Sequence, residues 1–203
     1  MTDELRKSDR SEAQREIVKV LALRTIWAVI LLQSVLAPYF VSKGVELHDV
    51  FMIQAVFSAS LIIGEVPTGV LSDLISRRAM LIFASIMRGV GATALVVLDG
   101  FWGIATAYMF IAVANSALSG SDLALLIQRH REDIAENRTL LFYVGRQKML
   151  IFTAATMSGL IGGFIASESL VAAGVFNMVF AWLPLPIALT LLREGEKLSL
   201  IHI

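Results

Sequence analysis

The sequence contains no cysteine, which excludes a disulfide framework, a thiolate metal site and a catalytic thiol. Charge is also scarce, because only 17% of the 203 residues are Asp, Glu, Lys or Arg, against roughly 25% in a typical soluble domain. The 17 basic and 17 acidic side chains give no formal net charge. This balance argues against a nucleic-acid partner.

Two features are missing as well: a phosphate-binding loop for ATP, and a serine–histidine pair within the apolar runs. No glycine-rich phosphate loop with a lysine occurs, so ATP-driven pumping by this chain is not expected. The histidines His48, His130 and His202 all lie outside the long apolar runs, so a serine in such a run would have no histidine base beside it. We therefore expect no enzyme activity, no cofactor and no metal site.

What the sequence has in abundance is apolar residues: 57% of the chain is hydrophobic and the mean hydropathy is +0.75. A membrane-spanning helix needs about 20 largely apolar residues to cross a hydrocarbon core about 30 Å thick. Backbone groups in lipid must be satisfied within the segment, so continuous apolar runs predict helices. Six runs qualify, at residues 21–41, 51–71, 79–98, 101–127, 150–166 and 170–192. We predict an all-α membrane protein with a six-helix transmembrane bundle over residues 21–193.

The distribution of Lys and Arg predicts the orientation of this bundle. If residues 1–20 form a cytoplasmic lead-in, the connections on that side hold nearly all the basic residues, and the opposite connections hold only Lys43. Cytoplasmic connections carry such an excess. We expect a multi-pass protein of the cell membrane with both termini in the cytoplasm, including a cytoplasmic end at residues 194–203.

The last six residues, LSLIHI at 198–203, form an abrupt apolar end. One back-translation of them resembles the transposon end sequence used to prepare sequencing libraries, so we expect these residues to derive from adapter. The protein would then continue beyond Lys197. The alternative is a natural short tail.

A motif stands between the second and third predicted spans, in the segment GEVPTGVLSDLISRRAML. It resembles the signature loop of the major facilitator superfamily, G-x-x-x-D-x-x-G-R-R, and Glu65 begins a run similar to the E-x-P-T-G of one subgroup. Leu74 and Ser76 depart from the pattern, where a basic residue and a glycine are usual. The matching residues are Gly69, Asp73, Arg77 and Arg78.

The resemblance implies the N-terminal six-helix half of a fold with about twelve helices. Its members are secondary transporters, so the resemblance implies transport of a small solute by alternating access, including proton-coupled efflux. The partners would be the lipid bilayer, the solute, protons and the missing C-terminal half, which the signature loop would latch against. The residues alone leave two alternatives: a plain charged loop, and a complete six-span protein acting as a homodimeric transporter, channel or scaffold.

Four charged residues fall within the predicted spans: Arg24, Glu65, Arg88 and Asp122. A charge at the centre of a membrane helix costs about 2.5 to 3.5 kcal/mol even on insertion scales, so such residues need partners. Glu65 or Asp122 could couple transport to protons. The alternative is a neutral ion-pair cluster that holds the helices together.

Uncharged polar and small residues complete the candidates. The resemblance makes the first, second, fourth and fifth helices line the cavity, which selects Gln33, Gln54, Tyr108 and Asn115 as substrate contacts. The alternative is that these side chains join helices by hydrogen bonding. Small residues at four-residue spacing predict close helix packing; they are Ala112, Ser116, Gly120 and Ala124, and Gly159 with Gly163.

Overall fold

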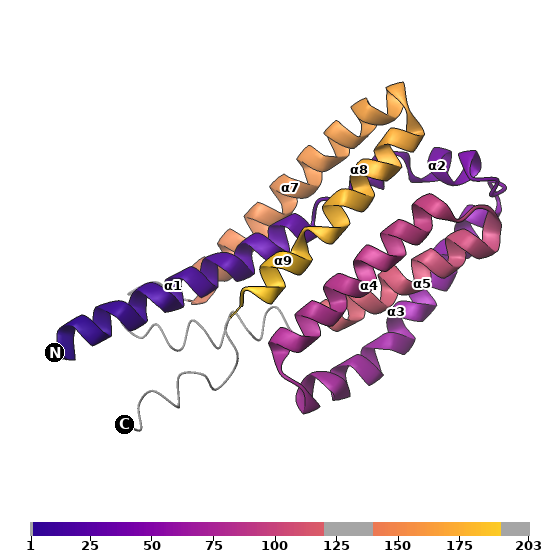
Figure 1. The fold of residues 1–203 in the computed structure, drawn as a ribbon. Helices are drawn as coiled ribbons and strands as arrows, with labels where there is room; N and C mark the ends of the chain where they lie inside the picture. The colour runs from indigo at the N-terminus through magenta and orange to yellow at the C-terminus, as the bar shows by residue number, and fades with distance from the viewer. Residues whose placement is uncertain (1, 120–139, 192–203) are drawn as a thin grey trace.

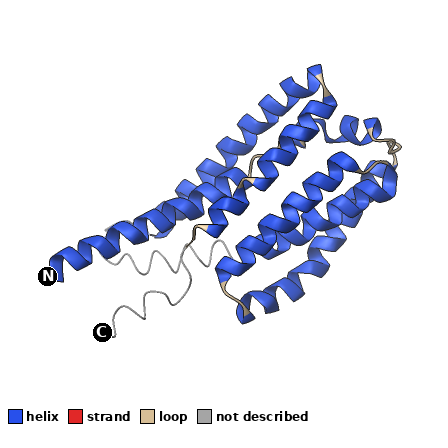
Figure 2. Ribbon diagram, viewed as in Figure 1, coloured by secondary structure: helices blue, strands red, loops and turns tan. Residues whose placement is uncertain are grey.

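The computed structural model describes residues 2–119 and 140–191, and this part of the chain is helical without any strand (Figures 1 and 2). A short 3-10 helix, η1, lies among eight α-helices in these ranges. The elements are α1 Thr2–Trp27, η1 Gln33–Val35, α2 Leu36–Ser42, α3 Asp49–Leu74, α4 Arg77–Val97, α5 Gly100–Ser119, α7 Leu140–Glu168, α8 Leu170–Trp182 and α9 Pro184–Leu189.

Five helical stretches are long and apolar enough to cross a membrane: residues 49–72, 77–97, 100–119, 144–168 and 170–189. They coincide with the second to sixth predicted spans, except that residues 120–127 of the fourth lie outside the described ranges. The last stretch contains an interruption at Leu183, where α9 begins with Pro184, since proline is tolerated in the first turn of a helix. The prediction of an all-α membrane protein is confirmed at this level.

The first predicted span, 21–41, is not a continuous helix, and the expected sixth spanning helix is absent from the described residues. α1 begins at Thr2, so the predicted lead-in is helical, and it ends at Trp27. We call residues 28–32 the α1 break. No glycine or proline occurs in this break, so local sequence does not cause it. Backbone groups in and beside it hydrogen-bond with side chains of other helices.

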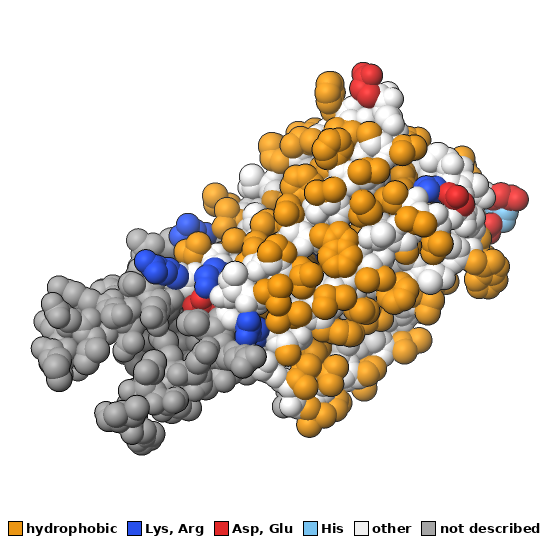
Figure 3. Space-filling view, in the orientation of Figure 1, with side chains coloured by type: hydrophobic (Ala, Val, Ile, Leu, Met, Phe, Trp, Pro, Cys, Tyr) orange, Lys and Arg blue, Asp and Glu red, His pale blue; other side chains and the backbone are white. Residues whose placement is uncertain are grey.

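The described elements form an up-and-down bundle with two ends (Figure 1). At the basic end, α3 meets α4, α7 begins and α9 ends; Lys and Arg side chains gather there in Figure 3. The opposite end holds α2 and the α4–α5 and α7–α8 turns. At that end Lys43 pairs with Asp99 at 3.0 Å and donates to the carbonyl oxygen of Val96 at 2.5 Å. The described charges thus follow the predicted asymmetry, although the sidedness itself stays a prediction.

Small residues allow the helices to approach closely. Ala112 and Ser116 of α5 are buried, and the Ser116 hydroxyl donates to the carbonyl oxygen of Leu61 on α3 at 2.9 Å. This confirms the predicted packing of the fourth span for these two positions; Gly120 and Ala124 lie outside the described residues. On α7 a Cβ at Gly159 would lie 2.9 Å from Ser34 Oγ, whereas one at Gly163 would meet nothing within 4 Å.

Gly162, rather than Gly163, is therefore the second closely packed glycine of α7. A Cβ at Gly162 would collide with the backbone of Leu31, in the α1 break. The prediction of a contact face at Gly159 and Gly163 is wrong for Gly163, because a four-residue spacing selected the wrong one of two adjacent glycines. α7 reaches the break through Gly159 and Gly162.

Two helices at opposite edges of the bundle, α3 and α7, expose most of their apolar side chains (Figures 1 and 3). Only 11% of the apolar window in each is buried inside the bundle. α3 also carries exposed polar residues on one stripe, because positions 54, 58 and 65 are separated by nearly whole helical turns. Gln54, Ser58 and Glu65 form this α3 stripe.

Candidate functional site

Arg88 lies near the middle of α4, and only 7% of its surface is exposed. Nη1 donates a hydrogen bond to the carbonyl oxygen of Trp27, and Nη2 donates to that of Val29 at 3.1 Å. The guanidinium carbon also lies 4.5 Å from the centroid of the Trp27 ring, within the range of a cation–π interaction. Arg88 therefore binds both the backbone and the side chain at the end of α1.

The α1 break explains why a buried cation is stable at this place. The last carbonyl groups of a helix have no partner within the helix and carry a partial negative charge. Arg88 of α4 satisfies the carbonyl at the end of α1, that of Trp27, and the carbonyl of Val29 in the break, and Ser158 of α7 accepts a hydrogen bond from the Ile30 backbone N–H at 3.2 Å. Side chains of two other helices thus hydrogen-bond the backbone groups of Trp27, Val29 and Ile30.

Asn115 of α5 completes the contacts around Trp27. The indole Nε1 of Trp27 donates to Asn115 Oδ1 at 3.0 Å. Because an indole N–H can only donate, this bond fixes the amide oxygen toward Trp27 and turns the amide nitrogen away from it. Trp27, Arg88 and Asn115 therefore link α1, α4 and α5 at one level of the bundle.

A cavity of about 60 Å³ lies beside Arg88 and Asn115. We call it the Arg88 pocket. Its lining consists of Ile30, Arg88, Ala92, Ile111, Asn115, Asn177 and Ala181. Arg88 stands eleven residues after the start of α4 and Asn177 twelve before the end of α9, so both lie about 16 to 18 Å from the basic end at 1.5 Å per residue. The pocket is therefore near the middle of the membrane-crossing part of the bundle.

The four predicted intramembrane charges do not all meet at this pocket. Glu65 is exposed on α3 and lines a separate cavity of about 160 Å³ with Thr68, Ser72 and Ser116. No ion pair joins Glu65 to Arg88 among the residues that the structure describes. Arg24 is half-buried one turn before Trp27, and Asp122 lies outside the described residues.

Of the four predicted substrate contacts, Asn115 alone lines the Arg88 pocket. Gln33 in η1 and Gln54 in α3 are exposed. Tyr108 is buried in an apolar cluster, with its ring 5.1 Å from that of Phe40 and 5.7 Å from that of Phe57. Sequence reasoning did not select Asn177, because the resemblance placed the sixth helix away from the cavity.

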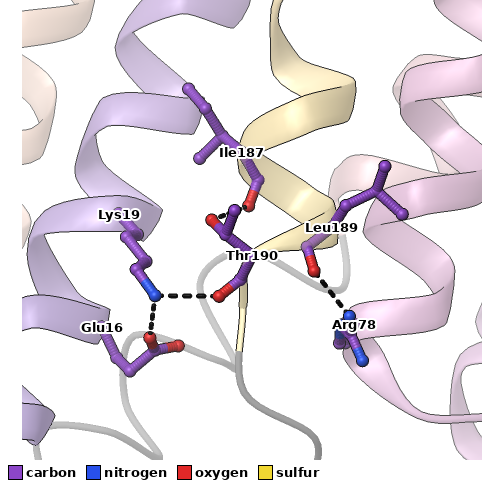
Figure 4. Close-up of polar contacts among 6 residues, drawn as sticks. All are labelled: Glu16, Lys19, Arg78, Ile187, Leu189 and Thr190. Atoms are coloured by element: carbon purple, nitrogen blue, oxygen red, sulfur yellow. Dashed lines mark hydrogen bonds and ion pairs between the residues drawn. The ribbon is translucent and has the colours of Figure 1, made fainter.

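The signature-loop residues occupy the junction of α3 and α4. Gly69 and Asp73 both belong to α3, which continues to Leu74, and the side chain of Asp73 lies outside what is described. Arg77 is the first residue of α4. Nη2 of Arg78 donates to the carbonyl oxygen of Leu189 at 2.6 Å (Figure 4). Arg78 therefore ties the start of α4 to the end of α9 within this bundle.

A second cation reaches the same helix end. Nζ of Lys19 on α1 donates to the carbonyl oxygen of Thr190 at 2.8 Å and pairs with Glu16 at 2.6 Å (Figure 4). Cations near the C-terminal end of a helix interact favourably with its exposed carbonyls. Lys19 and Arg78 thus join α1, α4 and α9 at the basic end.

Ser76, one of the two departures from the signature pattern, has a definite structural role. It is the N-cap of α4, with extended backbone angles, and its hydroxyl accepts a hydrogen bond from the Ala79 backbone N–H at 3.2 Å. α3 extends through Asp73 to Leu74, and the residue that caps α4 is Ser76. Serine is among the residues preferred at this position.

Substitutions of Ser76 should therefore show whether its hydroxyl stabilises the start of α4. We expect Ser76→Ala to lower the free energy of unfolding by about 1 kcal/mol, and Ser76→Gly by only a few tenths, because glycine is tolerated at the N-cap. Unfolding in mixed micelles, monitored by circular dichroism, measures both. Equal losses for the two variants would contradict the capping role.

Within residues 2–119 and 140–191, no group of three or more His, Asp or Glu side chains is arranged to hold a metal ion. No known protein-family model matches this chain, and no curated protein sequence matches it either.

Proposed function

We propose that this chain forms one bundle of a secondary transporter of the major facilitator type, which moves a small solute across the cell membrane by alternating access. The observation that carries the proposal is the Arg88 pocket at the α1 break. Substrate sites of secondary transporters lie near the membrane midplane, where interrupted helices expose backbone groups and polar side chains. The signature-like residues Gly69, Asp73, Arg77 and Arg78 support the same assignment.

The exposed α3 stripe supports the presence of a second bundle. Gln54 and Glu65 are exposed on a helix that is mostly apolar. Charged residues within membrane helices almost always face a bundle interior or a water-filled cavity, since lipid solvates them poorly. A C-terminal half of the same protein would cover this stripe and enclose a cavity; a second copy of this chain would do so in the homodimeric alternative.

Transport can be tested before the solute is identified. We would reconstitute the full-length protein, with the second bundle included, in vesicles that contain a pH-sensitive dye, impose a pH gradient and add a panel of small solutes. A coupled solute should accelerate the collapse of the gradient relative to protein-free vesicles. If no solute in a broad panel does so, and none accumulates in the vesicles, the proposal fails.

The proton-coupling hypothesis predicts a specific effect of Asp122. Asp122→Asn should abolish pH-dependent transport while leaving the protein in the membrane, because a neutral amide cannot carry the coupled proton. Asp99→Asn is a matched control, since Asp99 is exposed in the α4–α5 turn, at the end of the bundle away from the basic end, and pairs with Lys43. Unchanged pH dependence in Asp122→Asn would contradict the coupling role.

A further inference from the structure

The Arg88 pocket contains more hydrogen-bond donors than the described residues use. A guanidinium group has five N–H donors, and Arg88 gives one to Trp27 and one to Val29. Within the described ranges its other three N–H groups have no acceptor. A charged donor group is therefore available at the wall of the cavity.

The two asparagines add to this surplus. The amide oxygen of Asn115 is occupied by Trp27, which leaves the amide nitrogen, a double donor, without an acceptor in the described structure. Asn177 lines the same pocket and makes no hydrogen bond to any residue of ranges 2–119 and 140–191. All three polar side chains of the lining can thus donate to a guest molecule.

Among the residues that the structure describes, no acidic side chain lines the pocket to balance Arg88. The carbonyl groups at the end of α1 offer only a partial negative charge, equivalent to about half an elementary charge. A buried charge without a full counter-charge is unfavourable in a low-dielectric interior. A guest that carries one negative charge and several acceptor oxygens would compensate both the charge and the unused donors.

We propose that the Arg88 pocket binds the carboxylate group of a small organic anion. If the proposed transport function is correct, on which this step rests, that anion is the transported solute. A planar carboxylate can accept parallel hydrogen bonds from a guanidinium group. The remaining lining residues, Ile30, Ala92, Ile111 and Ala181, are apolar and suit a short carbon skeleton. The cavity of about 60 Å³ exceeds the roughly 10 to 15 Å³ that one water needs.

Binding can be measured without a gradient. Purified protein in lipid nanodiscs would be equilibrated by dialysis against carbon-14 acetate, with unlabelled acetate, acetamide or chloride as competitors. Acetamide has nearly the shape of acetate without its charge, and chloride has the charge without the planar oxygens. We expect saturable binding of acetate that unlabelled acetate displaces at least about tenfold better than either competitor, because charge-assisted bidentate bonds are lost in both.

The decisive variant is Asn177→Leu. It removes one donor group from the pocket while leaving the hydrogen bonds of Arg88 to Trp27 and Val29 intact, so the backbone contacts of the α1 break are kept. We expect acetate to bind about tenfold more weakly to Asn177→Leu, the loss typical of one hydrogen bond to a charged group. Thr106→Leu is the matched control, because Thr106 is exposed on α5 and its hydroxyl donates only to the carbonyl oxygen of Trp102 in the same helix, so the affinity of this variant for acetate should equal that of the unchanged protein.

Three results would overturn the inference: no saturable binding of acetate, displacement by acetamide or chloride as effective as by acetate, or unchanged affinity in Asn177→Leu. Transport is measured separately in vesicles, so the two proposals fail differently. Acetate binding without transport of any solute would leave the anion site standing and refute the transport function. Transport of a solute without a carboxylate, with no acetate binding, would refute the anion site alone.

Discussion

Gly162→Ala should destabilise the bundle by about 3 kcal/mol, near the upper end of the usual cost of overpacking. The added Cβ would collide with the carbonyl group of Leu31, and a backbone atom cannot move away without rebuilding the α1 break. This cost outweighs the roughly 1 kcal/mol by which alanine favours a helix over glycine. Reversible unfolding in mixed micelles would measure the change in free energy.

The adjacent glycine provides the control for this prediction. A Cβ at Gly163 would meet no atom within 4 Å, so Gly163→Ala should gain up to about 1 kcal/mol from helix propensity alone. Glycine-to-alanine substitutions at these two neighbouring positions of α7 should therefore change the free energy of unfolding in opposite directions. If both variants shift stability in the same direction, the close approach of α7 to the break is wrong.

Arg88→Met is expected to lower the free energy of unfolding by about 2 to 6 kcal/mol. Methionine keeps much of the side-chain length but leaves the carbonyl oxygens of Trp27 and Val29 without their donor. Each buried unsatisfied group costs about 1 to 3 kcal/mol, and lipid offers no water to replace the bond. Unfolding of the purified protein in mixed micelles, monitored by circular dichroism, would measure this loss.

A conservative change sharpens the test of Arg88. Arg88→Lys retains the charge but replaces a planar fork by a single ammonium group, which cannot match the geometry of two carbonyls and a stacked ring. We expect it to recover only part of the stability. Arg146→Met is the control, since Arg146 is exposed on α7 and its loss should change stability by less than about 0.5 kcal/mol. Equal stability of Arg88→Met and the unchanged protein would contradict the capping of the break.

Long apolar runs carried most of the fold prediction. Continuous stretches such as 51–71 and 79–98 predicted helices because lipid leaves no other way to satisfy the backbone, and α3 and α4 lie there. The α1 break was not predictable in the same way. Residues 28–32 are as apolar as their neighbours and contain neither glycine nor proline, so the break depends on Arg88, Ser158 and Gly162, which come from distant helices.

Part of the candidate site could be predicted from the sequence. Arg88 was selected because a charge in a span is expensive, and Asn115 because it is a polar residue on the fourth span, which the resemblance makes line the cavity. Their meeting at one pocket requires the three-dimensional packing of α4 against α5. Asn177 could have been found by depth alone, since it and Arg88 lie at nearly equal distances from the basic end. Equal depth of polar residues on separate spans is a signal that motif comparison does not use.

The contacts at the α1 break also set an order of events during synthesis. Arg88 follows Trp27 by 61 residues, and Ser158 follows Ile30 by 128. A chain emerging from the ribosome makes α1 first, long before α4 and α7 exist. Until those helices arrive, the backbone groups of residues 27–30 must remain near water or the membrane interface, because the hydrocarbon core cannot solvate them. The first apolar segment is therefore expected to settle at its final depth late, only after α7 has been inserted.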